Sequence, residues 1–250
     1  ATQVVTLIDT TSPEIFVPSD IVVEATGLTT TMVELGEATG YDIMGIASVT
    51  EHPPRLFILG ETTVTWTTTD TSGNSASATQ TVTIVDTIAP NITAPESIMM
   101  EATSVDSNIV VLGNPVSNDL VDTPSISNNA PDVFPLGETT VTWTAVDESG
   151  NSASATQTVT IVDTTAPELT MPEDVMISAF SLEKQVEIGE AQAYDLVDSI
   201  PTVTNNVPNI FPLGDTVVTW NVSDEFGNSA SFQQVISVQP CGKPLSYYNQ

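Results

Sequence analysis

Apolar and polar side chains alternate over long threonine-rich stretches of this chain. In residues 139–146, Val141 and Trp143 alternate with threonines. This period of two is typical of a strand with one buried face. A turn sequence rich in Asp, Gly and Asn follows at 147–151, and a second run of threonine and valine covers 152–162. The pattern predicts a β-hairpin whose turn contains Gly150 and Asn151, residues tolerant of positive φ, and whose tryptophan lies in a core.

The same pattern occurs three times with a period of 77 residues. The repeated tryptophans are Trp66, Trp143 and Trp220. A sequence Asp-Thr-x-x-Pro recurs at the same period, and its proline is expected to end the preceding strand and stiffen the joint. A fixed period indicates one structural unit copied in tandem. The predicted repeats cover 9–85, 86–162 and 163–239.

Shorter strand patterns complete each repeat. In repeat two we expect them around 98–101 and 109–112, which gives each repeat roughly six or seven strands. Compensating length differences between repeats two and three predict loops. These loops are 102–108 with 179–184, and 121–125 with 197–202. The expected fold is all-β, with tandem immunoglobulin-like β-sandwich modules arranged end to end. A carbohydrate-binding tryptophan is the alternative to a core tryptophan.

The two ends of the chain depart from the repeats. Residues 1–8 match the end of a repeat, residues 78–85, and so predict the last strand of a preceding module. That strand is either a remnant of a longer array or a strand donated to a partner. Its apolar residues are Val4, Val5, Leu7 and Ile8. The tail 240–250 resembles the start of another module, and the sequence leaves the role of its Cys241 open.

Composition narrows the function. The chain has 32 acidic residues against three lysines and arginines, for a formal net charge of −29. Phosphate binding needs basic side chains, so nucleic acid is excluded as a partner. No apolar run approaches the roughly 20 residues of a spanning helix. One histidine and one cysteine cannot form a catalytic constellation in each repeat, so we expect no enzyme activity.

The recurring aspartates point to a cation. If the modules follow one another end to end, the turn of each hairpin lies beside the linker that enters the same module. Each junction then gathers a linker Asp and a turn Asp, and a neighbouring Glu and backbone carbonyls would complete the six to eight oxygens that Ca²⁺ prefers. The predicted ligands are Asp9 with Asp70, Asp86 with Asp147 and Glu148, and Asp163 with Asp224 and Glu225. The alternative is that these aspartates only cap turns.

Two further features stay open at this level. Asp42, Asp119 and Asp195 also recur, but the pattern does not assign them to one end of a module. Asn91 and Asn221 stand in acceptor sequences for N-linked glycosylation.

These repeated sequence motifs resemble those of the hyalin-repeat (HYR) family. Its modules carry an Asp-x-x-x-Pro start, a Gly-x-Thr-x-Val-x-Trp strand, an Asp-x-x-Gly-Asn turn and a closing Thr-x-Thr-Val strand. The resemblance implies an immunoglobulin-related sandwich in extracellular or cell-surface proteins of adhesion or matrix assembly. Many members pair two cysteines, and apolar residues occupy those places here: Val17, Ala94 and Met171 against Ala78, Ala155 and Phe232. Their absence favours a prokaryotic, including archaeal, surface protein.

The expected function is a structural spacer or assembly element of an extracellular or cell-envelope protein: an S-layer, a filament or an adhesin stalk, with Ca²⁺ at its junctions. Its partners would be copies of itself or other surface proteins. One alternative is an adhesin module that binds a glycan or a protein through divergent loops such as 41–55. Another is a filament subunit that polymerises by donating residues 1–8.

Overall fold

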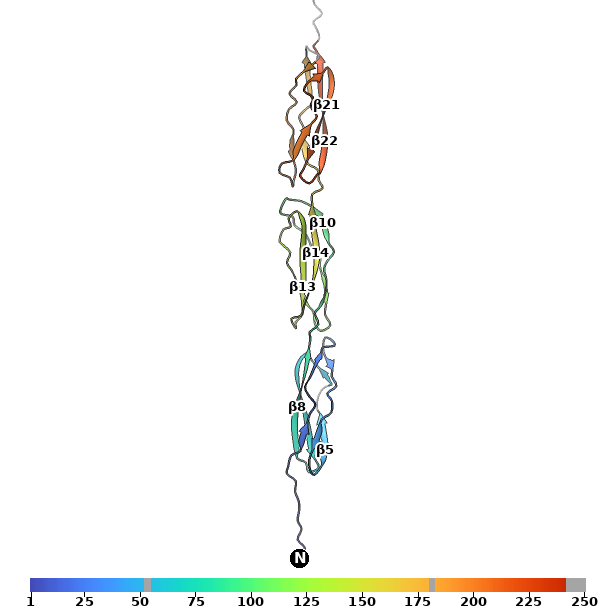
Figure 1. The fold of residues 1–250 in the computed structure, drawn as a ribbon, viewed down its shortest axis with the longest axis vertical. Helices are drawn as coiled ribbons and strands as arrows, with labels where there is room; N and C mark the ends of the chain where they lie inside the picture. The colour runs from blue at the N-terminus through green and yellow to red at the C-terminus, as the bar shows by residue number, and fades with distance from the viewer. Residues whose placement is uncertain (52–54, 180–182, 242–250) are drawn as a thin grey trace, which may run out of the picture. The chain divides into compact units, whose positions relative to one another are not determined.

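The computed structural model describes residues 1–51, 55–179 and 183–241 (Figure 1). These residues form strands, turns and irregular segments, and contain no helix. It follows that none of them belongs to a helix long and apolar enough to span a membrane. The all-β class is confirmed.

Repeat one contains one larger sheet and two small ones. Its strands are β1 (Glu14–Phe16), β2 (Ile21–Glu24), β3 (Thr31–Met32), β4 (Thr39–Tyr41), β5 (Ile46–Glu51), β6 (Leu56–Phe57), β7 (Gly60–Asp70) and β8 (Ser75–Val85). The larger sheet has the order β2-β8-β7-β5, while β1 pairs with β4 and β3 pairs with β6. Strands β7 and β8 form an antiparallel hairpin, and β2 runs parallel to β8.

Repeat two has the same plan. Its strands are β9 (Asn91–Thr93), β10 (Ile98–Glu101), β11 (Val116–Asn118), β12 (Ser125–Asn128), β13 (Gly137–Val146) and β14 (Ser152–Val162). The sheet order is β10-β14-β13-β12, and β9 pairs with β11. The predicted hairpin and the strand at 98–101 are confirmed.

Repeat three has eight strands in its described part, as repeat one does. Its strands are β15 (Glu168–Thr170), β16 (Val175–Ala179), β17 (Glu183–Lys184), β18 (Gln192–Tyr194), β19 (Thr202–Asn205), β20 (Phe211–Pro212), β21 (Gly214–Ser223) and β22 (Ser229–Pro240). Its larger sheet has the order β16-β22-β21-β19. The chain is therefore a tandem of β-sandwich modules.

The core of each module is built around its tryptophan. Trp66, Trp143 and Trp220 are only 3%, 6% and 4% exposed. Alternate residues of the same hairpins, such as Val64 and Val82, are also buried. A carbohydrate cannot reach side chains buried to this degree, so the interpretation of these residues as sugar platforms is wrong.

Two local predictions need correction, and the turn shows one detail that the sequence left open. Residues 109–112 form no strand, although neighbouring Asn108 makes an isolated bridge with Phe134. The predicted loop 179–184 includes the end of β16 and all of β17, and residues 180–182 lie outside the described part. Positive φ occurs at Gly150 (92°), whereas no described residue other than glycine has a positive φ. Asn151 therefore serves the turn through its side chain and not through its backbone conformation.

The start of the chain forms no strand, and most of the tail lies outside the described part. Residues 1–13 contain no strand, and Val4, Val5, Leu7 and Ile8 are all exposed. The role of residues 1–8 as part of a preceding module or as a donated strand stays a prediction. Of the tail, only Pro240 and Cys241 are described, and Cys241 is a free, half-buried thiol.

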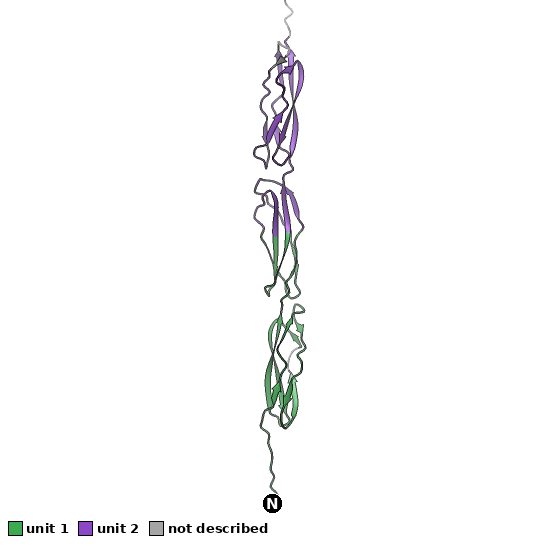
Figure 2. Ribbon diagram, in the orientation of Figure 1, with its two compact units in different colours: residues 1–95, 114–129, 142–156 green, residues 96–113, 130–141, 157–250 purple. Residues whose placement is uncertain are grey.

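By compactness the chain divides into two units, and the division passes through repeat two (Figure 2). One unit comprises residues 1–95, 114–129 and 142–156; the other comprises 96–113, 130–141 and 157–250. The segment that joins repeats one and two lies within the first unit, and the segment that joins repeats two and three lies within the second. The contacts around each junction can therefore be described inside a single unit.

Candidate metal centres

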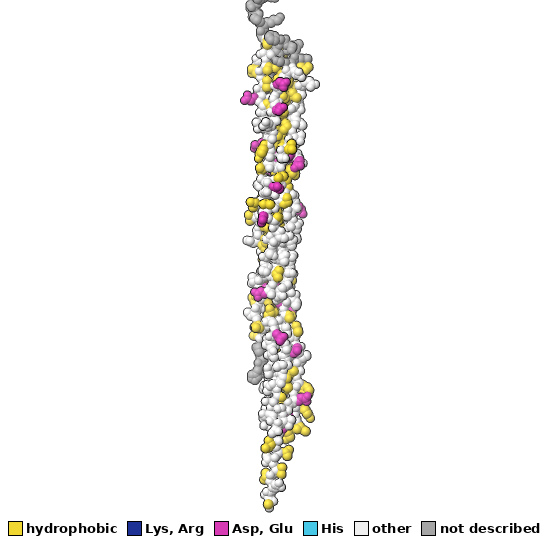
Figure 3. All heavy atoms as spheres, turned by 90° about the vertical axis from the view of Figure 1, so that its left-hand side faces the viewer, with side chains coloured by type: hydrophobic (Ala, Val, Ile, Leu, Met, Phe, Trp, Pro, Cys, Tyr) yellow, Lys and Arg dark blue, Asp and Glu magenta, His cyan; other side chains and the backbone are white. Residues whose placement is uncertain are grey.

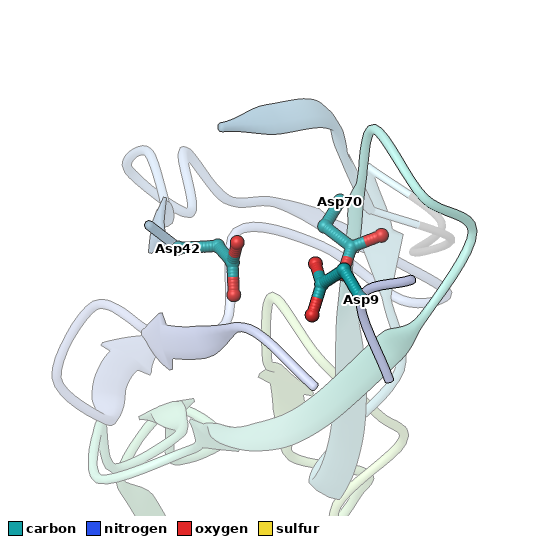
Figure 4. A group of neighbouring side chains, drawn as sticks. All are labelled: Asp9, Asp42 and Asp70. Carbon is teal, nitrogen blue, oxygen red and sulfur yellow. The ribbon is translucent and has the colours of Figure 1, made fainter. Parts of the chain in front are cut away.

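Three groups of aspartates recur, one at the start of each repeat. Within each group, ligand oxygens of the three carboxylates lie within 4.8 Å of one another. The groups are Asp9, Asp42 and Asp70; Asp86, Asp122 and Asp147; and Asp163, Asp195 and Asp224. In the first group, Asp42 faces Asp9 and Asp70 from the opposite side (Figure 4). The predicted meeting of each linker Asp with its turn Asp is what the structure shows.

The turn aspartates are held by the last residue of the hairpin turn. Asp147 directly follows β13, and its Oδ1 accepts a hydrogen bond from the Asn151 backbone N–H at 2.7 Å. Its Oδ2 accepts one from the Asn151 side-chain amide at 2.9 Å. The same amide donates to the backbone carbonyl of Asp86 at 3.1 Å, so it ties the turn to the linker. Asn74 and Asn228 make the equivalent bonds in repeats one and three.

In each linker Asp, one carboxylate oxygen accepts a hydrogen bond and the other has no partner. Oδ1 of Asp9, Asp86 and Asp163 accepts the backbone N–H two residues further on, at 3.0, 3.3 and 3.2 Å. Oδ2 of each is buried and has no hydrogen-bond partner. Asp86 as a residue is only 8% exposed. Capping therefore explains one oxygen of each linker Asp, and the second is a buried acceptor without a donor, which is unfavourable unless a cation or water satisfies it.

The third carboxylate comes from a loop. In repeats one and three it is Asp42 and Asp195, which directly follow β4 and β18. In repeat two it is Asp122, between β11 and β12, and Asp119 is not in the group. From the sequence we noted Asp42, Asp119 and Asp195 without assigning them to one end of a module; Asp122, which takes the place of Asp119 in the group, was missed. The recurrence of Asp after a short strand, which ends at Tyr41, Asn118 or Tyr194, was the available signal, but in repeat two the group takes its Asp from three residues further along the loop.

Glu148 and Glu225 do not join these groups. Both side chains are exposed, and neither carboxylate belongs to the three clusters. Their backbone N–H groups donate to Oδ2 of Asp122 and Asp198 at 2.7 and 3.1 Å. The backbone of Glu148 and Glu225, and not their carboxylates, therefore contacts the loop aspartates.

The charges within a group oppose one another. Burial raises the pKa of Asp163; the Thr165 N–H opposes this, and the nearby carboxylates of Asp195, Asp224 and Glu101 raise it further. For Asp70, burial also works against ionisation, but hydrogen bonds from Asn74, Ser72 and Gly73 outweigh it and lower the pKa. Three carboxylates in one place without a cation are mutually destabilising. A divalent cation would convert this repulsion into attraction.

The residues fit a hard cation. Each group offers three carboxylates within 4.8 Å, with a buried, unpartnered oxygen on the linker Asp. None of these ligands is sulfur or imidazole. Oxygen-only ligand sets suit Ca²⁺ and Mg²⁺ and disfavour zinc and copper.

The other candidate residues lie at the surface. Asn91 and Asn221 are exposed, as glycosylation requires, although Oδ1 of Asn221 accepts a hydrogen bond from Ser231 at 2.6 Å. Glycosylation at both stays a prediction. Figure 3 shows acidic side chains spread over the face that it draws, with no basic side chain visible there.

Comparison with known proteins identifies the family. The HYR domain family model matches residues 8–84 and 85–161. The chain is 35% identical to hyalin of Strongylocentrotus purpuratus over 264 residues, which covers 92% of this chain and 21% of that protein. It is 35% identical to hyalin of Lytechinus variegatus, with 92% of this chain and 47% of the relative covered. The chain thus spans less than half the length of either relative.

More distant similarities follow. The sushi, von Willebrand factor type A, EGF and pentraxin domain-containing protein 1 of Rattus norvegicus is 29% identical, over 72% of this chain and 5% of its own length. Drosophila N-cadherin EC1-4 has a TM-score of 0.35 and 13% identity, covering 92% of this chain and 76% of that one, and this likeness concerns the fold alone.

These relatives correct one expectation and confirm two. They are animal proteins, so the prokaryotic origin inferred from the missing cysteines finds no support. The apolar residues at the cysteine positions are all half-buried. The tandem modules and the extracellular surface location are confirmed: this chain belongs to the HYR domain family.

Proposed function

We propose that this chain is an extracellular structural or adhesive segment whose module junctions are stiffened by bound Ca²⁺. The observation that carries the proposal is the threefold recurrence of one arrangement: a linker, a turn and a loop carboxylate meet, and the linker carboxylate keeps a buried oxygen without a partner. Adhesive or matrix partners, including further copies of the chain, fit a module of this family.

Ca²⁺ fits the site better than Mg²⁺. The ligands come from three separate segments of backbone, and such sites tolerate the longer, more variable bonds of Ca²⁺. Mg²⁺ demands a nearly ideal octahedron and keeps much of its water. The buried unpartnered oxygen of each linker Asp calls for a ligand that enters the group itself.

A bound ion would join segments that belong to neighbouring modules. The linker Asp86 directly follows β8 of repeat one, whereas Asp122 and Asp147 belong to repeat two. Coordination by all three would fix the last strand of one module against the turn and loop of the next. The ion would therefore limit bending at the junction.

Thermal unfolding tests the cation. After treatment with a chelator, millimolar Ca²⁺ should raise the thermal midpoint in a concentration-dependent way. Binding to the folded state alone adds about 2.7 kcal/mol at 100 times the dissociation constant. The variant Asp86→Asn with Asp163→Asn should lose most of this gain, and the exposed Asp132→Asn is the matched control. A midpoint that stays fixed at millimolar Ca²⁺ would rule out the cation.

Among the assemblies expected from the sequence, a stalk or matrix element suits the animal relatives better than an S-layer. The family membership also supports the absence of catalysis, because HYR modules are adhesion modules. A turnover assay against generic glycosidase and esterase substrates that gave activity dependent on one of the clustered aspartates would contradict this.

Adhesion through the divergent segment 41–55 is the second candidate. Ile43 and Met44 are exposed apolar side chains at its start, and they flank the loop carboxylate Asp42. Residues 52–54 lie outside the described part. Saturable binding to a glycan array or a partner protein, lost when residues 44–55 are replaced, would favour this role over a spacer.

Polymerisation by strand donation is the third candidate. Residues 1–8 carry the apolar pattern of a closing strand, yet Val4, Val5, Leu7 and Ile8 are exposed. An added strand could bury them against the sheet edge of another copy. Deletion of residues 1–8 should then abolish polymers while the modules stay folded; polymers that persist would rule it out.

A further inference from the structure

The three aspartate groups differ at one position of the loop that supplies the third carboxylate. Repeat two has Asp119 and Asp122 in this loop, and repeat three has Asp195 and Asp198. Repeat one has Asp42, but Gly45 stands where Asp122 and Asp198 stand. The loop of repeat one therefore carries one negative charge fewer.

The second loop Asp performs a defined task. Oδ2 of Asp122 accepts the backbone N–H of Glu148, and Oδ2 of Asp198 accepts that of Glu225. In repeat one the corresponding amide, the N–H of Thr71, donates to the backbone carbonyl of Gly45 at 3.1 Å. A carbonyl thus replaces a carboxylate at the same point of the turn. The turn is held in either case, so the carboxylate is not needed for the turn alone.

In repeat two this carboxylate is part of the cation group. Oδ1 of Asp122 is buried without a hydrogen-bond partner, as is Oδ2 of Asp86. The group of repeat two therefore has two unpartnered buried oxygens. The groups of repeats one and three have one each, on Asp9 and on Asp163.

We propose that the three sites are unequal: those at the starts of repeats two and three bind Ca²⁺ more tightly, and the site at the start of repeat one fills at a higher concentration. This inference rests on the proposed function. Each group has three carboxylates, but repeats two and three carry one further carboxylate in the same loop, Asp119 and Asp198, which repeat one lacks. Additional negative charge near a Ca²⁺ site raises its affinity, and an outer carboxylate that fixes the surrounding backbone adds to it. Stiffening would then proceed in steps as the Ca²⁺ concentration rises.

A charge-removing substitution separates this proposal from simple turn capping. In Asp122→Asn and Asp198→Asn, the amide oxygen can still accept the N–H of Glu148 or Glu225, so capping is retained while the charge is lost. If the aspartates only cap, the affinity for Ca²⁺ stays the same. If they hold the cation or orient its ligands, the affinity falls by about 10–100-fold, the loss typical of such groups in metal sites.

The experiment is equilibrium dialysis of the chelator-treated full chain with radioactive Ca²⁺. We expect three bound ions in two classes, two tight and one weaker, and a single weak class in the double variant Asp122→Asn, Asp198→Asn. Asp42→Asn should remove only the weak ion, which assigns it to repeat one. Asp132→Asn is the control that keeps all three. Gly45→Asp is unsuitable, because Gly45 has a φ of +100° that strains other residues.

Each outcome has a distinct meaning. Three ions of equal affinity, or a double variant that binds as the wild type does, would overturn the inequality and leave the proposed function standing. No bound ion at millimolar Ca²⁺ would overturn both. Circular dichroism of every variant verifies that the modules are folded, so a loss of binding reports on the sites.

Discussion

At the scale of single residues, a buried glutamine makes the recurring tryptophan possible. Gln80 is fully buried, and its side-chain oxygen accepts the indole N–H of Trp66 at 3.1 Å. Its amide nitrogen donates to the carbonyls of Ser19 and Leu35. Gln234 makes the equivalent three bonds in repeat three. One side chain thus satisfies the Trp66 N–H and the Leu35 carbonyl inside the core, and it also donates to the carbonyl of the exposed Ser19.

The first prediction concerns this glutamine. Gln80→Met keeps the volume but leaves the buried Trp66 N–H and the buried Leu35 carbonyl without their partner. Each unsatisfied buried group costs about 1–3 kcal/mol, so we expect a marked loss of stability in repeat one. Chemical denaturation followed by Trp fluorescence measures it. Thr79→Val, on the exposed side of the same strand, is the control, and equal stability of the two variants would contradict the argument.

The residue scale also shows what the sequence could and could not predict. The pairing of linker and turn aspartates followed from the hairpin and the tandem order alone, because both are fixed by strand register. Asp122 did not follow, since it lies in a loop whose length differs between repeats and which has no register. The unpartnered oxygens are likewise a property of burial that no spacing reveals.

At the scale of elements, hydrogen bonds from both neighbouring modules hold each linker. Glu24, at the end of β2, accepts the N–H and the hydroxyl of Thr87 at 2.7 and 2.9 Å. Asn151, in the turn of repeat two, holds the carbonyl of Asp86. Glu101 with Thr164, and Asn228 with Asp163, repeat this at the next junction. The junctions therefore have some order of their own before any cation binds.

The second prediction uses pH to test the hydrogen bonds between Glu101 and the linker. Hydrogen bonds from the hydroxyl and N–H of Thr164 and the hydroxyl of Thr165 lower the pKa of Glu101 below its ordinary 4.5. A lowered folded-state pKa contributes stability above the unfolded value, and this contribution is lost as the pH falls through the folded value. Glu101→Gln should therefore lower the thermal midpoint at pH 7 in chelator.

The difference between Glu101→Gln and the wild type should shrink as the pH falls below about 4.5 and through the lower folded pKa. Relief of the repulsion between Glu101 and Asp163 opposes the effect, but this repulsion is the smallest of the contributions to the Asp163 pKa. The exposed Glu138→Gln is the matched control. A pH-independent difference would show that the contribution of Glu101 does not come from its charge.

One element also explains a failed prediction. Residues 109–112 have the apolar character of a strand, yet Ile109 and Val111 are 75% and 88% exposed. Asn108 takes the local hydrogen bonds instead: its side chain accepts the N–H of Thr103 and donates to the carbonyl of Phe134. A buried side chain that satisfies the backbone replaces a strand ladder here, which an apolar pattern cannot indicate.

At the scale of the whole molecule, the net charge of −29 sets the terms of assembly. Copies with this charge repel one another at low ionic strength, and bound divalent cations reduce that repulsion. Acidic groups are also concentrated where the modules meet, so the same ions that neutralise the chain would act on its joints. Rigidity and the capacity for association are therefore expected to rise together with Ca²⁺.

The third prediction measures this coupling by hydrogen exchange on the whole chain. Ca²⁺ should slow exchange of the backbone amides around the linkers, at residues 86–88 and 163–165, because an ion that joins linker, turn and loop suppresses local opening. Amides in the centres of β7, β13 and β21 are the internal reference, since their ladder bonds do not depend on the junctions. NaCl at the same ionic strength should not protect the linkers, because screening acts on all exposed carboxylates alike. Protection that NaCl reproduces, or that spreads evenly over the sheets, would mean that the ions neutralise the chain without fixing its joints.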